Sequence, residues 1–396
     1  MQIRMLVFLC FVSALVNGTG AYNLLPISMN AVNGVFILAF VWIYYQKYYC
    51  SGSESIRFDL IKLLILSLYM FYMCAFLLRE IVVYSEYDFN FAVGVIRDYS
   101  YLYKGLVVFL NITIIYNLVK NDRVFVFIPI LSLLVLLFGL LLESQHLIDF
   151  NENISQYDIE NQSTEQKLIA RPGGFLNPNM TAAISLIWLY IALESHLNTQ
   201  AIIKISALAL TLSVCLLTQS RAAIIFLSMY SIYIILVRQK INYLIIIILG
   251  CLSLFISAFY FDLEIANDLI EKFAARGDSK EDSAQERLNL LIYAINSFFD
   301  SPLLGNGIRY VEKNSGINAS SHNQILDILA NFGLVGLAMV SMVFFAFYHK
   351  NSISYLLLCI FPTLIFSHNF FEDIAFQTSL AFAYCVPIDI NERFKL

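Results

Sequence analysis

Apolar runs of about 17–22 residues recur from one end of the chain to the other, and each could cross a hydrocarbon core of about 30 Å as an α-helix. Hydrophobic residues make up 59% of the 396 residues and charged residues only 13%. This balance lies outside the range of soluble domains. The alternation of polar and apolar residues that is typical of strands is absent. The sequence therefore predicts an all-α, polytopic integral membrane protein.

The apolar runs predict twelve membrane-spanning helices. The longest run, residues 201–238, would extend about 57 Å as a single helix. It must therefore turn back at its polar centre, Thr218-Gln219-Ser220-Arg221. The predicted spans are residues 4–20, 29–46, 60–78, 99–119, 124–142, 179–194, 201–217, 222–238, 241–260, 324–347, 352–368 and 373–390.

Residues 1–21 also resemble a secretory signal peptide, because Arg4 precedes an apolar core from Met5 to Val16. No convincing cleavage site of the A-x-A type follows. The charge pattern of the chain also requires this segment as a span. We therefore interpret it as the first helix.

The distribution of basic residues orients the predicted spans. Short basic connectors such as Lys120-Asn-Asp-Arg123 and Arg238-Gln-Lys240 favour the cytoplasmic side, whereas the long loops are net acidic. Twelve spans with both termini cytoplasmic satisfy every connector. One membrane domain results, made of five helices (1–142), an outer loop (143–178), four helices (179–260), a large outer loop (261–323) and three helices (324–396).

The large outer loop contains an amphipathic helical pattern that ends at Pro302. Its apolar residues recur at helical spacing and form one face: Leu288, Leu291, Ile292, Ile295, Phe298 and Phe299. Beside a membrane, such a helix lies in the interface or caps the bundle. A packing helix of a small outer domain fits the pattern equally well, so both interpretations stay open.

Three residues of the outer side are candidates for chemistry: Arg171, Arg221 and His322. The guanidinium group of arginine stays charged and donates paired hydrogen bonds to phosphate. Histidine can accept a proton from a hydroxyl group near neutral pH. Purely structural roles stay open, since Arg171 also fits a solvated loop and His322 also fits a helix cap. Arg221 is harder to dismiss, because a charge within an apolar hairpin is costly unless it is paired or hydrated.

Nothing in the sequence predicts a metal ion or a cofactor. The seven cysteines lie in or beside apolar runs, without the Cys/His spacing of metal sites. No glycine-rich nucleotide loop lies on the predicted cytoplasmic side. The tripeptide Ser321-His-Asn323 recurs at Ser367-His-Asn369 in different surroundings, and we interpret this repetition as chance.

Several motifs together resemble the O-antigen polymerase and O-antigen ligase superfamily of bacterial envelope glycosyltransferases. They occur in the order typical of that superfamily, over roughly residues 170–340. The matching stretches are Arg171-Pro-Gly-Gly-Phe-Leu-Asn-Pro-Asn179, Gln219-Ser-Arg-Ala222, Glu286-Arg-Leu288 with Ser301-Pro-Leu-Leu-Gly-Asn-Gly307, Ser321-His-Asn-Gln-Ile-Leu326 and Asn331-Phe-Gly-Leu-Val-Gly336.

The resemblance implies a metal-independent transfer of glycan from an undecaprenyl-diphosphate carrier at the periplasmic face of the bacterial inner membrane. It implies that Arg171 and Arg221 hold the diphosphate and that His322 activates the acceptor hydroxyl. Arg287, Asn179 and Asn323 lie in the same motifs and are the candidate substrate-binding residues. The implied partners are the lipid-linked oligosaccharide and the bilayer. A chain-length regulator stays open as a further partner, and nucleic acid has no role.

The superfamily leaves the acceptor open. A polymerase transfers the chain to another carrier-linked repeat, a ligase to lipid A–core, and a related branch to protein. We favour a polymerase because the N-terminal half is idiosyncratic and rich in Tyr, Phe and Ile. The alternative of another class is a transporter of lipid-linked oligosaccharide. It would place charges along a path through the midplane, whereas the notable polar groups here gather on one face.

Overall fold

The computed structural model describes residues 8, 11–21, 68, 71–72, 75, 78, 126–144, 173–194, 201–238, 280–307, 309–316, 323–347, 353–366 and 374–385. Every regular element within these residues is helical, which confirms the all-α class. The predicted spans 29–46, 99–119 and 241–260 lie outside the described residues. The spans 4–20 and 60–78 are described only in part.

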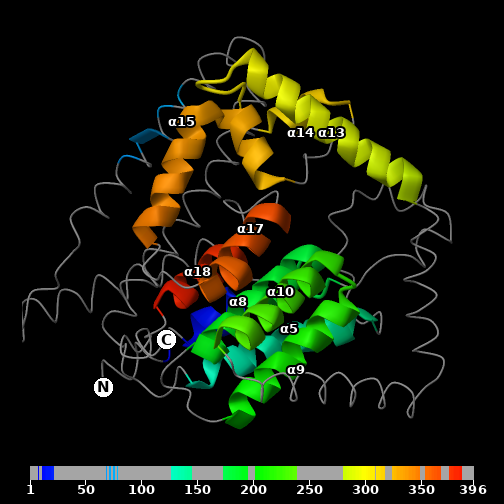
Figure 1. Ribbon diagram of the computed structural model, residues 1–396, viewed down its shortest axis with the longest axis vertical. Coiled ribbons are helices and arrows are strands. Elements are labelled where there is room, and N and C mark those ends of the chain that lie inside the picture. The colour runs from blue at the N-terminus through cyan, green and yellow to red at the C-terminus, as the bar shows by residue number, and fades with distance from the viewer. Residues whose placement is uncertain are drawn as a thin grey trace, which may run out of the picture.

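Helix α8 (Pro178–Glu194) is the central helix of the main core. Its residues are buried on all sides from Thr181 to Ala192, as expected for a helix enclosed by others. The surrounding helices, whose bundle occupies the lower part of Figure 1, include α5 (Ile128–Ser144), α9 (Ala201–Leu217), α10 (Arg221–Arg238) and α18 (Ile374–Cys385). The Trp188 ring of α8 packs against the Phe382 ring of α18, with centroids 5.5 Å apart.

The described part of the first predicted span belongs to this core. The Trp188 Nε1 group donates a hydrogen bond to the Gly18 carbonyl (3.0 Å). Asn17 and Thr19 beside it are fully buried. The described part of residues 4–20 therefore packs against α8.

The predicted span 352–368 consists of three helical pieces. They are α16 (Ile353–Tyr355), the π-helix η4 (Leu356–Ile360) and α17 (Phe361–Phe366). Pro362 explains the wider turn, because it has no N–H to donate and its ring conflicts with the carbonyl one turn earlier. The helical character predicted for residues 352–368 is confirmed within the described residues, and the π-helix is a feature that the sequence did not indicate.

Helices α13 (Lys280–Asp300), α14 (Tyr310–Asn314) and α15 (Gln324–Phe347) form a second assembly, seen in the upper part of Figure 1. A small core joins them and consists of Leu290, Ala294, Val311 and Ala330. Larger apolar side chains of α13, namely Leu288, Ile292, Ile295 and Phe299, are exposed. Thus α13 packs through Leu290 and Ala294 and leaves most of the predicted apolar face uncovered.

Helix α15 begins where the tenth span was predicted, but it is broken at Gly333 (φ 67°, ψ −165°). The Tyr72 hydroxyl donates to the Phe332 carbonyl just before the break (3.1 Å). Within the described residues, Gln324–Met342 is the one helical stretch long and apolar enough to cross a membrane. Four shorter apolar stretches accompany it: Ile128–Glu143, Ala201–Leu217, Arg221–Tyr233 and Ile353–Leu364. The arrangement of twelve spans remains a prediction.

Candidate active site

The glycine turn before α8 is fixed by the helices on either side of it. The Glu143 carboxylate at the end of α5 accepts hydrogen bonds from the backbone N–H groups of Gly173 (2.6 Å) and Gly174 (2.5 Å). The Thr181 hydroxyl of α8 donates to the Gly173 carbonyl (2.5 Å). A Cβ atom at Gly173 would overlap the Leu176 carbonyl oxygen, so only glycine fits. Arg171 precedes this turn and lies outside the described residues.

Helix α9 ends in a Schellman motif that forms the predicted hairpin. The Ser220 N–H donates to the Cys215 carbonyl (3.3 Å) and the Gln219 N–H to the Leu216 carbonyl (3.0 Å). This motif requires a left-handed residue, usually glycine, after the helix. Gln219 occupies that position with φ 51°, at a cost of about 1 kcal/mol relative to the right-handed conformation. Arg221 follows as the exposed first residue of α10.

The turn before α8 and the α9–α10 hairpin meet at one end of the bundle. The Ser220 hydroxyl donates to the Asn179 side-chain oxygen (3.5 Å). Asn177 caps α8, because its side-chain oxygen accepts the Asn179 N–H (3.0 Å). The N-termini of α8 and α10 therefore lie side by side, with Arg221 at the second. Two helix N-termini and a guanidinium group favour a bound anion.

The turn Ser301–Gly307 packs against the break in α15 and forms hydrogen bonds with the backbone groups on both sides of it. Asn306 reinforces it by donating from its side chain to the Ser297 and Ala330 carbonyls. A Cβ atom at Gly333 would overlap the Leu303 carbonyl oxygen, and one at Gly305 would overlap the backbone of Asn331. Four backbone hydrogen bonds join the turn to α15: Asn306 N–H to Ala330 (3.0 Å), Gly307 N–H to Asn331 (3.0 Å), Leu334 N–H to Pro302 (2.8 Å) and Val335 N–H to Leu303 (3.2 Å).

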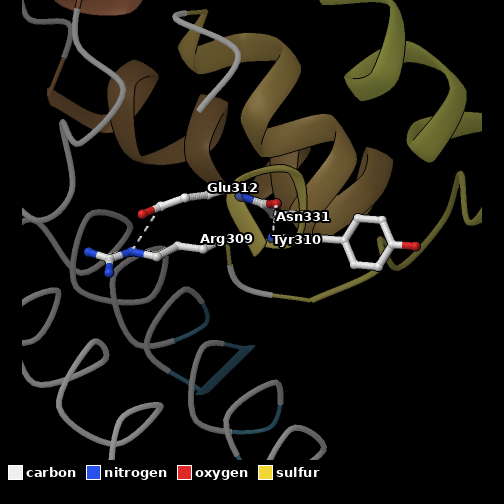
Figure 2. Close-up of polar contacts among 4 residues, drawn as sticks. All are labelled: Arg309, Tyr310, Glu312 and Asn331. Carbon is white, nitrogen blue, oxygen red and sulfur yellow. Dashed lines mark hydrogen bonds and ion pairs between the residues drawn. The ribbon is translucent and has the colours of Figure 1, made fainter. Parts of the chain in front are cut away.

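Arg309 is a cationic residue of this region that the sequence analysis left out. It has left-handed backbone angles (φ 53°, ψ 31°) before α14. Its guanidinium group pairs with Glu312 (3.6 Å), as Figure 2 shows. The same view shows the Tyr310 N–H held by the Asn331 side-chain oxygen (3.1 Å). The signal available in the sequence was its place two residues after the Gly305-Asn306-Gly307 turn.

The structure describes one of the other predicted site residues fully, one only in its backbone and one not at all. The Asn323 side-chain oxygen caps α15, because it accepts the N–H groups of Ile325 (3.0 Å) and Leu326 (3.2 Å). Arg287 lies on α13, and its side chain is outside the described residues. His322 is also outside them. The structure thus brings Asn179 next to the hairpin of Arg221, while the roles predicted for Arg171, Arg221 and His322 stay predictions.

A model of a known protein family matches part of the chain. Residues 206–341 match the family model described as O-antigen ligase. The matched range includes the hairpin, α13 and most of α15, and it confirms the predicted resemblance to the O-antigen polymerase and ligase superfamily. No curated protein matches the chain. The family consists of glycosyltransferase-type enzymes of the bacterial envelope that act on lipid-linked glycans.

Proposed function

We propose that this chain is a polymerase of O-antigen or a related surface polysaccharide. It transfers glycan from undecaprenyl diphosphate to a carrier-linked repeat unit at the periplasmic face of the inner membrane. The observation that carries the proposed transfer from the diphosphate carrier is the contact between Ser220 and Asn179. This contact joins two separate motifs around the paired N-termini of α8 and α10, where an anionic leaving group would bind.

The reaction that we propose is a displacement at the anomeric carbon of the donor sugar. The acceptor hydroxyl oxygen forms the new bond to that carbon, and the bond to the diphosphate oxygen breaks. The proton of the hydroxyl passes to the imidazole of His322. Arg221, with Arg171 as the second cation, binds the diphosphate more strongly as its negative charge develops. That difference lowers the barrier selectively.

Contacts between the ends of the predicted spans support the proposed topology. Three predicted outer ends meet at the α8 N-terminus: Gly20 next to Leu176, Glu143 at Gly173 and Gly174, and Ser220 at Asn179. Towards the other end of α8, the Tyr230 hydroxyl donates to the Glu194 carboxylate (3.4 Å). This agrees with spans that alternate in direction and with a site on a single face of the membrane.

A ligase that transfers the glycan to lipid A–core is the second candidate. The observation that favours it is the description of the matched family, O-antigen ligase. Both enzymes require the same carrier-binding site, and they differ only in the acceptor. A transporter is the third and weakest candidate, because the two motifs that contact each other lie at one end of the bundle and not along a path through it.

Replacement of Arg221 tests the binding of the diphosphate. In assays of the purified full-length chain with undecaprenyl-diphosphate-linked repeats, we expect Arg221→Lys to lower kcat/KM by about 10- to 100-fold. A point charge does not replace the paired hydrogen bonds of arginine. Arg238→Lys is the matched control, because it changes the same residue type about 25 Å away at the other end of α10. Full activity of Arg221→Lys would show that charge alone suffices, against the proposed site.

A further inference from the structure

Gln219 occupies a backbone position that the fold itself would assign to glycine. The two hydrogen bonds that close the end of α9 come from backbone N–H groups, so they need no side chain at this residue. A Schellman motif with glycine would form the same hairpin without strain. Strained residues that persist in a fold point to a role for their side chains.

The Gln219 side chain is buried but has no structural use in the hairpin. The residue is only 5% exposed, and among the described residues its backbone N–H, not its carboxamide, makes the hydrogen bond in the hairpin. Its two neighbours differ, since the Thr218 hydroxyl donates to the Val214 carbonyl (2.8 Å) and the Ser220 hydroxyl to Asn179. The amide atoms of the Gln219 side chain are not among the enclosed polar atoms that lack a partner, so they reach the surface and are open to a partner from outside the chain. A ligand of the site would supply one.

We propose that the Gln219 carboxamide binds a hydroxyl group of the lipid-linked glycan, next to the diphosphate. This inference rests on the proposed function. A carboxamide both donates and accepts hydrogen bonds, as a sugar hydroxyl does. The diphosphate accepts only, and Arg221 and the N-termini of α8 and α10 already offer it donors. Gln219 thus recognises the sugar that is attached to the diphosphate, one residue from the Ser220–Asn179 contact.

Gln219→Gly separates this role from a structural one, because it removes the carboxamide and relieves the left-handed strain at once. We expect a Tm equal to or above that of the wild type. We expect kcat/KM for the undecaprenyl-diphosphate-linked repeat to fall about three- to tenfold, the effect of one hydrogen bond. Gln219→Ala also lacks the carboxamide but keeps the strain. Gln219→Ala should lose as much kcat/KM as Gln219→Gly, but its Tm should be lower than that of Gln219→Gly.

Inhibition by undecaprenyl diphosphate without glycan identifies the group that is bound. If Gln219 contacts the sugar, the inhibition constant of this carrier is the same for wild type and Gln219→Gly. If Gln219→Gly weakened inhibition by this carrier as much as it lowers kcat/KM, the contact would lie on the diphosphate, and the assignment would be overturned. Unchanged kcat/KM in Gln219→Gly would also overturn it. A wild-type chain that neither binds nor turns over the lipid-linked repeat would instead refute the proposed function.

Discussion

The Glu143 carboxylate stabilises a turn that lies 30 residues further along the chain. A single carboxylate oxygen accepts both glycine N–H groups, and both glycines are buried. We expect Glu143→Ala to leave two buried donors without an acceptor, which costs about 2–4 kcal/mol of stability. Glu143→Gln retains an oxygen at the same place and should remain close to wild type. Thermal unfolding and transfer activity of the purified variants measure both effects.

The outcome of that pair of variants distinguishes geometry from charge. Because Arg171 directly precedes the turn, a displaced turn should reduce transfer even in the fraction of Glu143→Ala that folds. If Glu143→Gln were as inactive as Glu143→Ala, the negative charge would be required, and hydrogen-bond acceptance would be an insufficient account.

Candidate site residues stand out in the sequence where their chemistry is local. Arg221 stood out because an arginine within an apolar hairpin is costly unless it serves a purpose, and the structure places it at the start of α10. The importance of Glu143 was not predictable, because its partners are distant in sequence. The left-handed conformation of Gln219 was also missed, because this position normally reveals itself by a glycine.

At the scale of elements, the break in α15 depends on the close approach of two glycines, Gly305 and Gly333. We expect Gly333→Ala to destabilise the fold by more than about 2 kcal/mol, because the added Cβ would meet the Leu303 carbonyl in a backbone conformation that suits only glycine. Gly316→Ala is the matched control. Gly316 has φ +78°, but a Cβ added there would have no atom within 4 Å, so this variant should lose only about 1 kcal/mol. Thermal unfolding compares the two variants, and equal losses would contradict a steric role of the turn.

Helix bounds were more predictable than helix geometry. The spans 201–217 and 324–347 coincide with α9 and α15, since apolar length and polar caps determine both ends. The break at Gly333 was missed, because the apolar pattern continues through it and the turn that satisfies the freed backbone groups comes from elsewhere in the chain. The amphipathic pattern of α13 was recognised, but the sequence did not indicate that Leu290 and Ala294, outside the predicted apolar face, make the packing contacts.

At the scale of the whole molecule, the two ends of α8 have different character. Its N-terminus gathers glycine turns, caps and the hairpin of Arg221, whereas Glu194 near its C-terminus meets Tyr230. The motifs in the first half of the matched segment thus lie on a bundle that also includes α5 and α8, which precede that segment. The anion site that we propose therefore needs helices from both parts of the chain. This explains why the motifs extend beyond the range of the family model.

The acceptor is a property of the whole molecule, and the pattern of lipopolysaccharide in cells reveals it. Loss of a polymerase leaves single repeats that are still transferred to lipid A–core, so we expect the long ladder of a deletion strain to collapse to one band above the unsubstituted core. His322→Ala should give the same band at normal protein levels, because it removes the proposed base and not the fold. His368→Ala, in the repeated Ser-His-Asn tripeptide, is the matched control and should keep the ladder. Bare core with polymer on the undecaprenyl carrier would identify a ligase instead, and unpolymerised carrier-linked repeats held on the cytoplasmic side would identify a transporter.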